Sequence, residues 1–229
     1  MKKLKYLIFD LDNTLIHSDV IYERALKSIA VDQSGSAFQK ARTLVKTQLP
    51  PLHTSARNRL LYFKSMRETE KDFSAFEVLH MMELYENSLF RETLDQVKAL
   101  NRHVLFQELC RQGFQLGIIS NENLRTQLIK LKALDERGAF FKSCLFSEEV
   151  GVEKPNPFIF ESFFARSGWS PEEAVFIGDD EEADILGASH FNMKTIKTWE
   201  FCNSATPRET KASMQIEKLT DLLQLFAKN

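Results

Sequence analysis

The stretch FDLDNTL, residues 9–15, places two aspartates directly after the first apolar run of the chain. Residues 4–9 are few and mainly apolar, which is typical of a buried strand. Asp10 and Asp12 follow where such a strand ends, although carboxylates repel each other and are costly to bury. In parallel α/β sheets, ligands bind beyond the carboxyl ends of the strands. We therefore expect a binding site at Asp10 and Asp12.

Four later stretches have the same character and predict further strands: FQLGIIS (114–120), SCLFS (143–147), AVFIG (174–178) and MKTIKTW (193–199). Apolar residues at helical spacing lie between and after them: Leu124, Leu128, Leu131 and Leu134; Phe160, Phe163 and Phe164; and a final helix with Ile216, Leu219, Leu222, Leu223 and Phe226. This alternation predicts an α/β fold in which helices cover both faces of a parallel sheet.

The span from about residue 17 to residue 92 differs, because it has no strand-like run and almost no glycine. Three apolar stripes at helical spacing cross it: Phe38, Ala41 and Val45; Ala56, Leu60 and Phe63; and Phe73, Phe76, Leu79 and Met82. The segment LPPLH (49–53) breaks the helical pattern. The span therefore predicts an all-helical insert between the first strand and the rest of the sheet.

Bulk composition narrows the class of protein. The 229 residues suit one large domain or a domain with an insert, and 43% hydrophobic content is enough for a packed core. A net charge of −2 without a basic stripe argues against a nucleic-acid surface. No run approaches the roughly 20 apolar residues of a membrane span, and the first apolar run is too short for a secretory signal. The three scattered cysteines form no CxxC pair, so we expect a reduced, cytoplasmic setting.

Polar residues at the predicted strand ends should meet at one edge of the sheet. Asp10 and Asp12 follow the first strand, Ser120 and Asn121 close the second, and Asp179, Asp180 and Asp184 follow the fourth. Lys154 lies in a loop ahead of a helix. Carboxylates, a hydroxyl and one cation in the same place predict a site for a divalent metal and a phosphate.

Four motifs resemble the haloacid dehalogenase superfamily: DLDNTL (10–15), IISN (118–121), EKPNP (153–157) and GDDEEAD (178–184). The resemblance spans residues 4 to about 198. It implies a Rossmann-like three-layer core with a central parallel sheet, residues 1–16 and 93–229, and an inserted helical cap, residues 17–92. It also implies a Mg²⁺-dependent phosphatase that hydrolyses a small phosphorylated metabolite through an aspartyl-phosphate.

The two aspartates of the first motif resemble residues with separate roles. Asp10 resembles the family's nucleophile and, with Asp179 and the backbone carbonyl of Asp12, would hold Mg²⁺. The Asp12 side chain resembles the general acid/base, whose pKa should lie near the working pH. We expect partial burial and a nearby anion to raise the pKa of Asp12.

The remaining motif residues would bind phosphate or support the site. Ser120, the backbone N–H of Asn121 and Lys154 suit phosphate oxygens, helped by a helix that begins near Ser120. Thr14 and Asp184 are expected to hold their neighbours in place, and Asp184 to contact Lys154 or a metal-bound water. Asn13 tolerates a left-handed turn, and the role of Asp180 stays open.

The insert offers possible substrate contacts. His53, Arg57 and Arg59 could bind an anionic substrate, but a solvated helix face explains them as well. A phosphosugar mutase with the same motifs and a non-catalytic binding protein on this fold remain alternatives. A dehalogenase is disfavoured, because dehalogenases of this family lack an acid at the position of Asp12. We expect a monomer or homodimer without a nucleic-acid or membrane partner.

Overall fold

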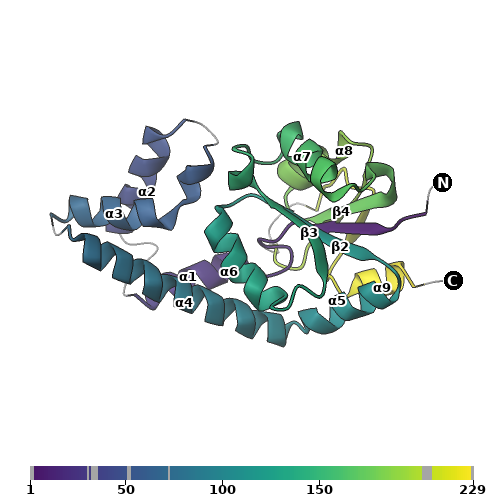
Figure 1. The fold of residues 1–229 in the computed structure, drawn as a ribbon, viewed down its shortest axis with the longest axis horizontal. Coiled ribbons are helices and arrows are strands. Elements are labelled where there is room, and N and C mark those ends of the chain that lie inside the picture. Colours follow the sequence, from purple (N-terminus) through teal and green to yellow (C-terminus); the bar gives the residue numbers. More distant parts are fainter. Residues whose placement is uncertain are drawn as a thin grey trace.

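The computed structural model describes residues 3–29, 31, 36–50, 53–71, 73–202 and 208–227. Figure 1 shows a sheet at its centre. The sheet is parallel and has six strands in the order β3-β2-β1-β4-β5-β6. The strands are β1 (Tyr6–Phe9), β2 (Gln115–Ser120), β3 (Phe141–Phe146), β4 (Ala174–Gly178), β5 (Lys194–Thr198) and β6 (Met214–Ile216). The predicted parallel sheet is confirmed.

The end of the chain differs from the prediction. Ile216 closes β6 and does not begin the final helix, which is α9 (Asp221–Leu225). No strand was predicted at β6, because only three residues form it and Gln215 interrupts its apolar character. The helix after β2 also begins later than expected, at Leu124 with Asn123 as its N-cap.

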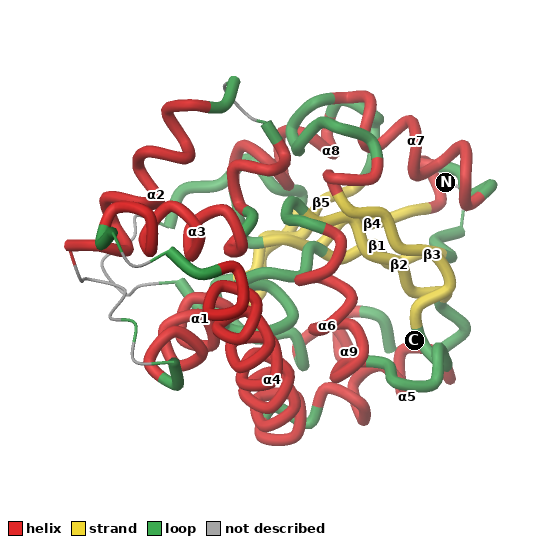
Figure 2. Tube along the Cα trace, turned by 60° about the vertical axis from the view of Figure 1, so that its left-hand side comes forward, coloured by secondary structure: helices red, strands yellow, loops and turns green. Residues whose placement is uncertain are grey.

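Helices cover both faces of the sheet, as Figures 1 and 2 show. α7 (Pro157–Ser167) and α8 (Gly187–Ser189) cover one face, where they pack on Ile8 and Phe176. α5 (Arg102–Arg111), α6 (Leu124–Leu134) and α9 cover the other, which carries Leu7 and Phe9. Neighbouring residues of β1 thus point to opposite faces, and both are buried because each face has its own helical layer.

The insert is helical, as predicted. It consists of α1 (Ser18–Lys27), α2 (Ser36–Gln48), a short turn at Thr54–Arg57, α3 (Arg59–Thr69) and α4 (Ala75–Ala99). Side chains cap the last two helices: Asn58 accepts from the N–H of Leu60, and Ser74 from that of Glu77. Pro51 and Leu52 of the predicted break lie outside the described residues. Because α4 continues past residue 92, the exact boundary between cap and core stays a prediction.

One large apolar cluster joins the sheet to the insert. Leu7 and Phe9 of β1 share it with Phe38 of α2, Phe63 of α3 and Leu89 of α4. Burial on this scale is the main stabilising contribution to such a domain. Among the described helices, none is both long and apolar enough to cross a membrane.

Candidate active site

The strand order brings the predicted residues together. β2, β1 and β4 are neighbours, so their carboxyl ends place Ser120, Asp10 and Asp179 side by side. Chain connections run in opposite directions on the two sides of β1, which is the position where open α/β sheets bind ligands. Ser120 is fully buried, and its hydroxyl donates to Asp10 Oδ1 at 3.0 Å.

Lys154 is the central cation of this cluster. Its Nζ donates to Asp10 Oδ1 at 2.7 Å, to Asp184 Oδ1 at 2.6 Å and to the carbonyl of Ile119 at 2.8 Å. The side chain of Asn121 holds the lysine's backbone from both sides, accepting from its N–H at 2.7 Å and donating to its carbonyl at 2.9 Å. The expected contact between Asp184 and Lys154 is therefore present, whereas the Asn121 side chain serves the loop.

Asp10, Asp179 and Asp184 offer three carboxylate oxygens that all lie within 4.8 Å of one another. Thr14 is fully buried and donates to Asp179 Oδ1 at 3.0 Å. Burial, together with repulsion from neighbouring carboxylates, raises the pKa of Asp10 to about 7 despite Lys154, and that of Asp179 to about 8. Hard oxygen donors with excess negative charge fit Mg²⁺, so the donor set fits the expected ion and includes Asp184 besides the predicted pair.

Asp12 belongs to a second set of contacts. Gln127 Nε2 donates to its Oδ2 at 2.8 Å, and the Ser18 hydroxyl and the ammonium of Lys130 donate to its Oδ1. Burial acts to raise the pKa of Asp12, but Lys130 and these hydrogen bonds outweigh it and lower the pKa below its usual range. The expected raised pKa was wrong because Lys130, which was not expected at the site, is buried beside Asp12.

Two other predicted features have local explanations. Asn13 adopts a left-handed backbone conformation with φ 55°. Asparagine tolerates this conformation better than most residues, which explains why it suits the turn. The Asp180 side chain accepts from the N–H groups of Glu182 and Ala183 at 2.9 and 2.7 Å. Asp180 thus caps a helical turn, and its exposed carboxylate stays outside the cluster of three.

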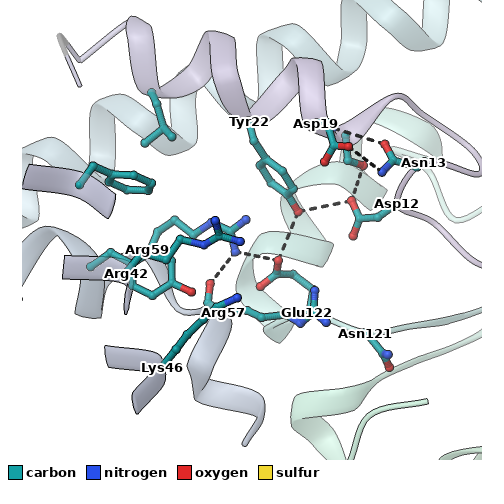
Figure 3. Close-up of a pocket in the computed structure, with 14 residues that line it drawn as sticks. Asp12, Asn13, Asp19, Tyr22, Arg42, Lys46, Arg57, Arg59, Asn121 and Glu122 are labelled. Atoms are coloured by element: carbon teal, nitrogen blue, oxygen red, sulfur yellow. Dashed lines mark hydrogen bonds and ion pairs between the residues drawn. The ribbon is translucent and has the colours of Figure 1, made fainter. Parts of the chain in front are cut away.

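A pocket of about 200 Å³ lies between this site and the insert (Figure 3). Arg57 and Arg59 line it, but both pair with core carboxylates: Arg57 Nε and a terminal nitrogen donate to Glu153 at 2.8 and 3.0 Å, and Arg59 donates to Glu122 at 2.7 Å. His53 is not among the residues that line the pocket, and its Nδ1 accepts from the N–H of Ser55.

Comparison with known proteins assigns the fold to a family. The family model for haloacid dehalogenase-like hydrolases matches residues 7–198. The chain belongs to this hydrolase family. Its relatives include a glyceraldehyde 3-phosphate phosphatase of Pyrococcus furiosus, 27% identical over 99% of this chain and 94% of the relative. A pyrophosphatase PpaX of Bacillus cereus is 25% identical over 98% of this chain and 97% of the relative. The magnesium-bound HAD-hydrolase YfnB of Bacillus subtilis superposes with a TM-score of 0.67 at 21% identity, covering 98% of this chain and 99% of that one.

Several residues of this HAD-like hydrolase's site escaped the sequence analysis. They are Tyr22, Arg42, Lys46, Glu122, Gln127 and Lys130. On α6, the leucine stripe suggested the buried face, yet Leu128 is 50% exposed while Gln127 and Lys130 are fully buried. A signal was available, because Gln127 and Lys130 are spaced i, i+3 and therefore lie on one face of a helix that follows a motif strand.

Proposed function

We propose that this protein is a Mg²⁺-dependent phosphatase that hydrolyses a small phosphorylated metabolite through an aspartyl-phosphate on Asp10. One observation carries the proposal: Lys154 binds Asp10 and Asp184, while Asp12, two residues from Asp10, has separate contacts and lines the pocket. The arrangement supplies a nucleophile and a cation at the strand ends, and a proton-transfer group that lines the adjoining pocket. The names of the relatives, which are phosphatases, agree with it.

In the first step, an oxygen of Asp10 attacks phosphorus, and the bond from phosphorus to the leaving oxygen breaks. Asp12 gives its proton to that oxygen. The phosphate that enters beside Asp12 raises its pKa and favours the protonated form needed here. In the second step, a water molecule attacks phosphorus, Asp12 takes the proton of the water, and the bond between Asp10 and phosphorus breaks to release inorganic phosphate.

The other residues of the site would bind the phosphate or the metal and orient the reacting groups. Lys154 and Ser120, both within 3.0 Å of Asp10 Oδ1, hold the carboxylate in position, and the ammonium of Lys154 supplies positive charge for a phosphate beside it. Asp10, Asp179 and Asp184 would hold Mg²⁺, which, when bound, offsets the repulsion between an anionic nucleophile and an anionic phosphate. The helical insert would cover the pocket and exclude water.

A panel of phosphorylated metabolites tests the proposal. The purified protein with Mg²⁺ should release phosphate from at least one member, and silence across a broad panel would contradict it. Hexose phosphates belong in the panel, because conversion to an isomeric phosphate without phosphate release would identify a mutase.

Two variants test the assigned roles. Asp10→Asn should abolish turnover, since the amide is a poor nucleophile, and full activity would exclude the covalent mechanism. Asp12→Asn should slow turnover by about 10²- to 10⁴-fold through loss of proton transfer. Asp180→Asn is the matched control: it removes an exposed carboxylate at the same edge of the sheet, and its activity should stay near that of wild type.

A further inference from the structure

The cap side of the pocket carries a basic wall, which we define as Arg42, Lys46, Arg57 and Arg59 (Figure 3). Arg42 and Lys46 are one turn apart on α2, Arg57 closes the short turn Thr54–Arg57, and Arg59 is the first residue of α3. Like charges one turn apart on a helix repel each other, so the pair on α2 is unfavourable by itself.

Two members of the basic wall have carboxylate partners in the core. Glu153 binds Arg57 through two oxygens, and Glu122 binds Arg59. On the other side of the pocket, Lys130 pairs with Asp12. These three ion pairs leave no net charge of their own.

The other two members have no such partner. Within the described part of the chain, no carboxylate forms an ion pair with Arg42 or Lys46. The neighbour of Arg42 in the pocket is the hydroxyl of Tyr62, which carries no charge to neutralise the guanidinium. Asp19, the remaining carboxylate of the pocket, accepts from Asn13 at 3.1 Å and lies beside it, away from α2 (Figure 3).

The pocket therefore has surplus positive charge next to α2. The pKa of Lys46 is lowered, first by burial and then by repulsion from Arg42, Arg57 and Arg59. The positive potential that repels a proton from Lys46 would also attract an anion.

We propose that Arg42 and Lys46 bind a second negatively charged group, a carboxylate or phosphate, on the part of the substrate that leaves when the phosphoryl group is transferred. This rests on the proposed phosphatase function and narrows its substrate class. The pocket of about 200 Å³ is smaller than the roughly 300–1,000 Å³ that holds drug-sized ligands. The substrate is accordingly a compact phosphorylated acid or a small phosphoanhydride such as pyrophosphate.

The test compares two compounds that carry a second anionic group with one that does not. 3-Phosphoglycerate carries a carboxylate where glycerol 3-phosphate carries a neutral hydroxymethyl group, and inorganic pyrophosphate carries a second phosphate. The value of kcat/KM should be about 10- to 100-fold higher for an anionic member than for glycerol 3-phosphate. The arms with 3-phosphoglycerate and pyrophosphate distinguish a carboxylate from a phosphate as the second anion.

Variants connect the preference to α2. In Arg42→Gln/Lys46→Gln, the ratio of kcat/KM for the preferred anionic compound to that for glycerol 3-phosphate should fall towards one. Lys40→Gln removes an exposed charge from the same helix outside the pocket and should leave the ratio unchanged. Equal turnover of charged and neutral compounds by wild type would overturn the inference, and so would an unchanged ratio in the double variant.

Binding to Asp10→Asn separates this inference from the proposed function. Calorimetry should show tighter binding of an anionic compound than of glycerol 3-phosphate. If that difference appears while wild type releases no phosphate from any of them, the anion site stands and the proposed hydrolysis fails. If wild type hydrolyses all compounds but Asp10→Asn binds them equally, the anion site fails and the hydrolysis stands.

Discussion

Replacing Lys154 by methionine should destabilise the metal-free protein strongly and in a pH-dependent way. The ammonium lies 2.7 Å from Asp10 and 2.6 Å from Asp184, and all three groups are buried. At an effective dielectric constant near 20, each contact is worth about 6 kcal/mol before desolvation is counted. Because the lysine's own desolvation offsets much of this, we expect a net loss of about 3–5 kcal/mol in the free energy of unfolding.

The pH dependence has a definite sign. The pKa of Asp10 is raised to about 7, so this carboxyl holds its proton in the folded protein at lower pH and needs no cation there. The loss in Lys154→Met should therefore be larger at about pH 8.5 than at about pH 5.5. Urea denaturation without and with Mg²⁺ measures it, and Mg²⁺ should restore part of the stability at the higher pH.

A matched control is Lys5→Met. Lys5 pairs with Glu173 at the same 2.7 Å, but its side chain is 52% exposed, and such a surface pair contributes little to stability. If Lys154→Met lost no more stability than Lys5→Met at the higher pH, the buried lysine would not neutralise Asp10 and Asp184 as described.

Three further changes test the same region. In the metal-free wild type, the pKa values of Asp10 and Asp179 are raised to about 7 and about 8. The protonated carboxyls therefore stabilise the fold below pH 4, and this contribution is lost as the pH rises to about 8. Denaturation at a series of pH values measures the loss. Mg²⁺ should consequently bind more tightly as the pH rises towards 8, and its binding should release protons from Asp10 and Asp179. Calorimetry in two buffers measures the affinity and the proton release. An affinity that does not change with pH would contradict the raised pKa values. Gly178→Ala should lower Mg²⁺ affinity by about 10-fold or more, because an added Cβ would overlap the Asp184 carboxylate, and calorimetric titration of the variant decides this. Lys130→Met leaves Asp12 without its cation and should cost about 3–5 kcal/mol at neutral pH in urea denaturation, whereas an unchanged midpoint would show that the charge of Asp12 does not depend on Lys130.

Strands with a continuous apolar run could be predicted from the sequence, whereas a strand without such a run could not. The run AVFIG matched β4 residue for residue, because every position is buried and a polar cluster follows at once. Met214–Ile216 failed as a strand prediction, since three residues that include an exposed glutamine give no pattern to detect. A strand of this length forms because β5 is already in place beside it.

The candidate site divides in the same way. Asp10, Ser120 and Asp179 could be placed from the sequence, because strand ends in a parallel sheet meet at one edge. Lys130 could not, since its spacing from Gln127 indicates a shared face of α6, but only the path of α6 past Asp12 shows that this face is buried. The sequence likewise did not show where the side chains of Arg57 and Arg59 point. They turn towards Glu153 and Glu122, which no local pattern marked as their partners.

The long helix α4 connects the insert to the core mechanically, because it packs on helices of both. Its 25 residues make it about 37 Å long, and it packs on α1 and α3 of the insert and on α6 of the core. A tilt of about five degrees about its C-terminal end would move its N-terminal end by about 3 Å, as far as the Arg57–Glu153 hydrogen bonds span. A small tilt of α4 would therefore be enough to part the insert from the core at Arg57 and Glu153.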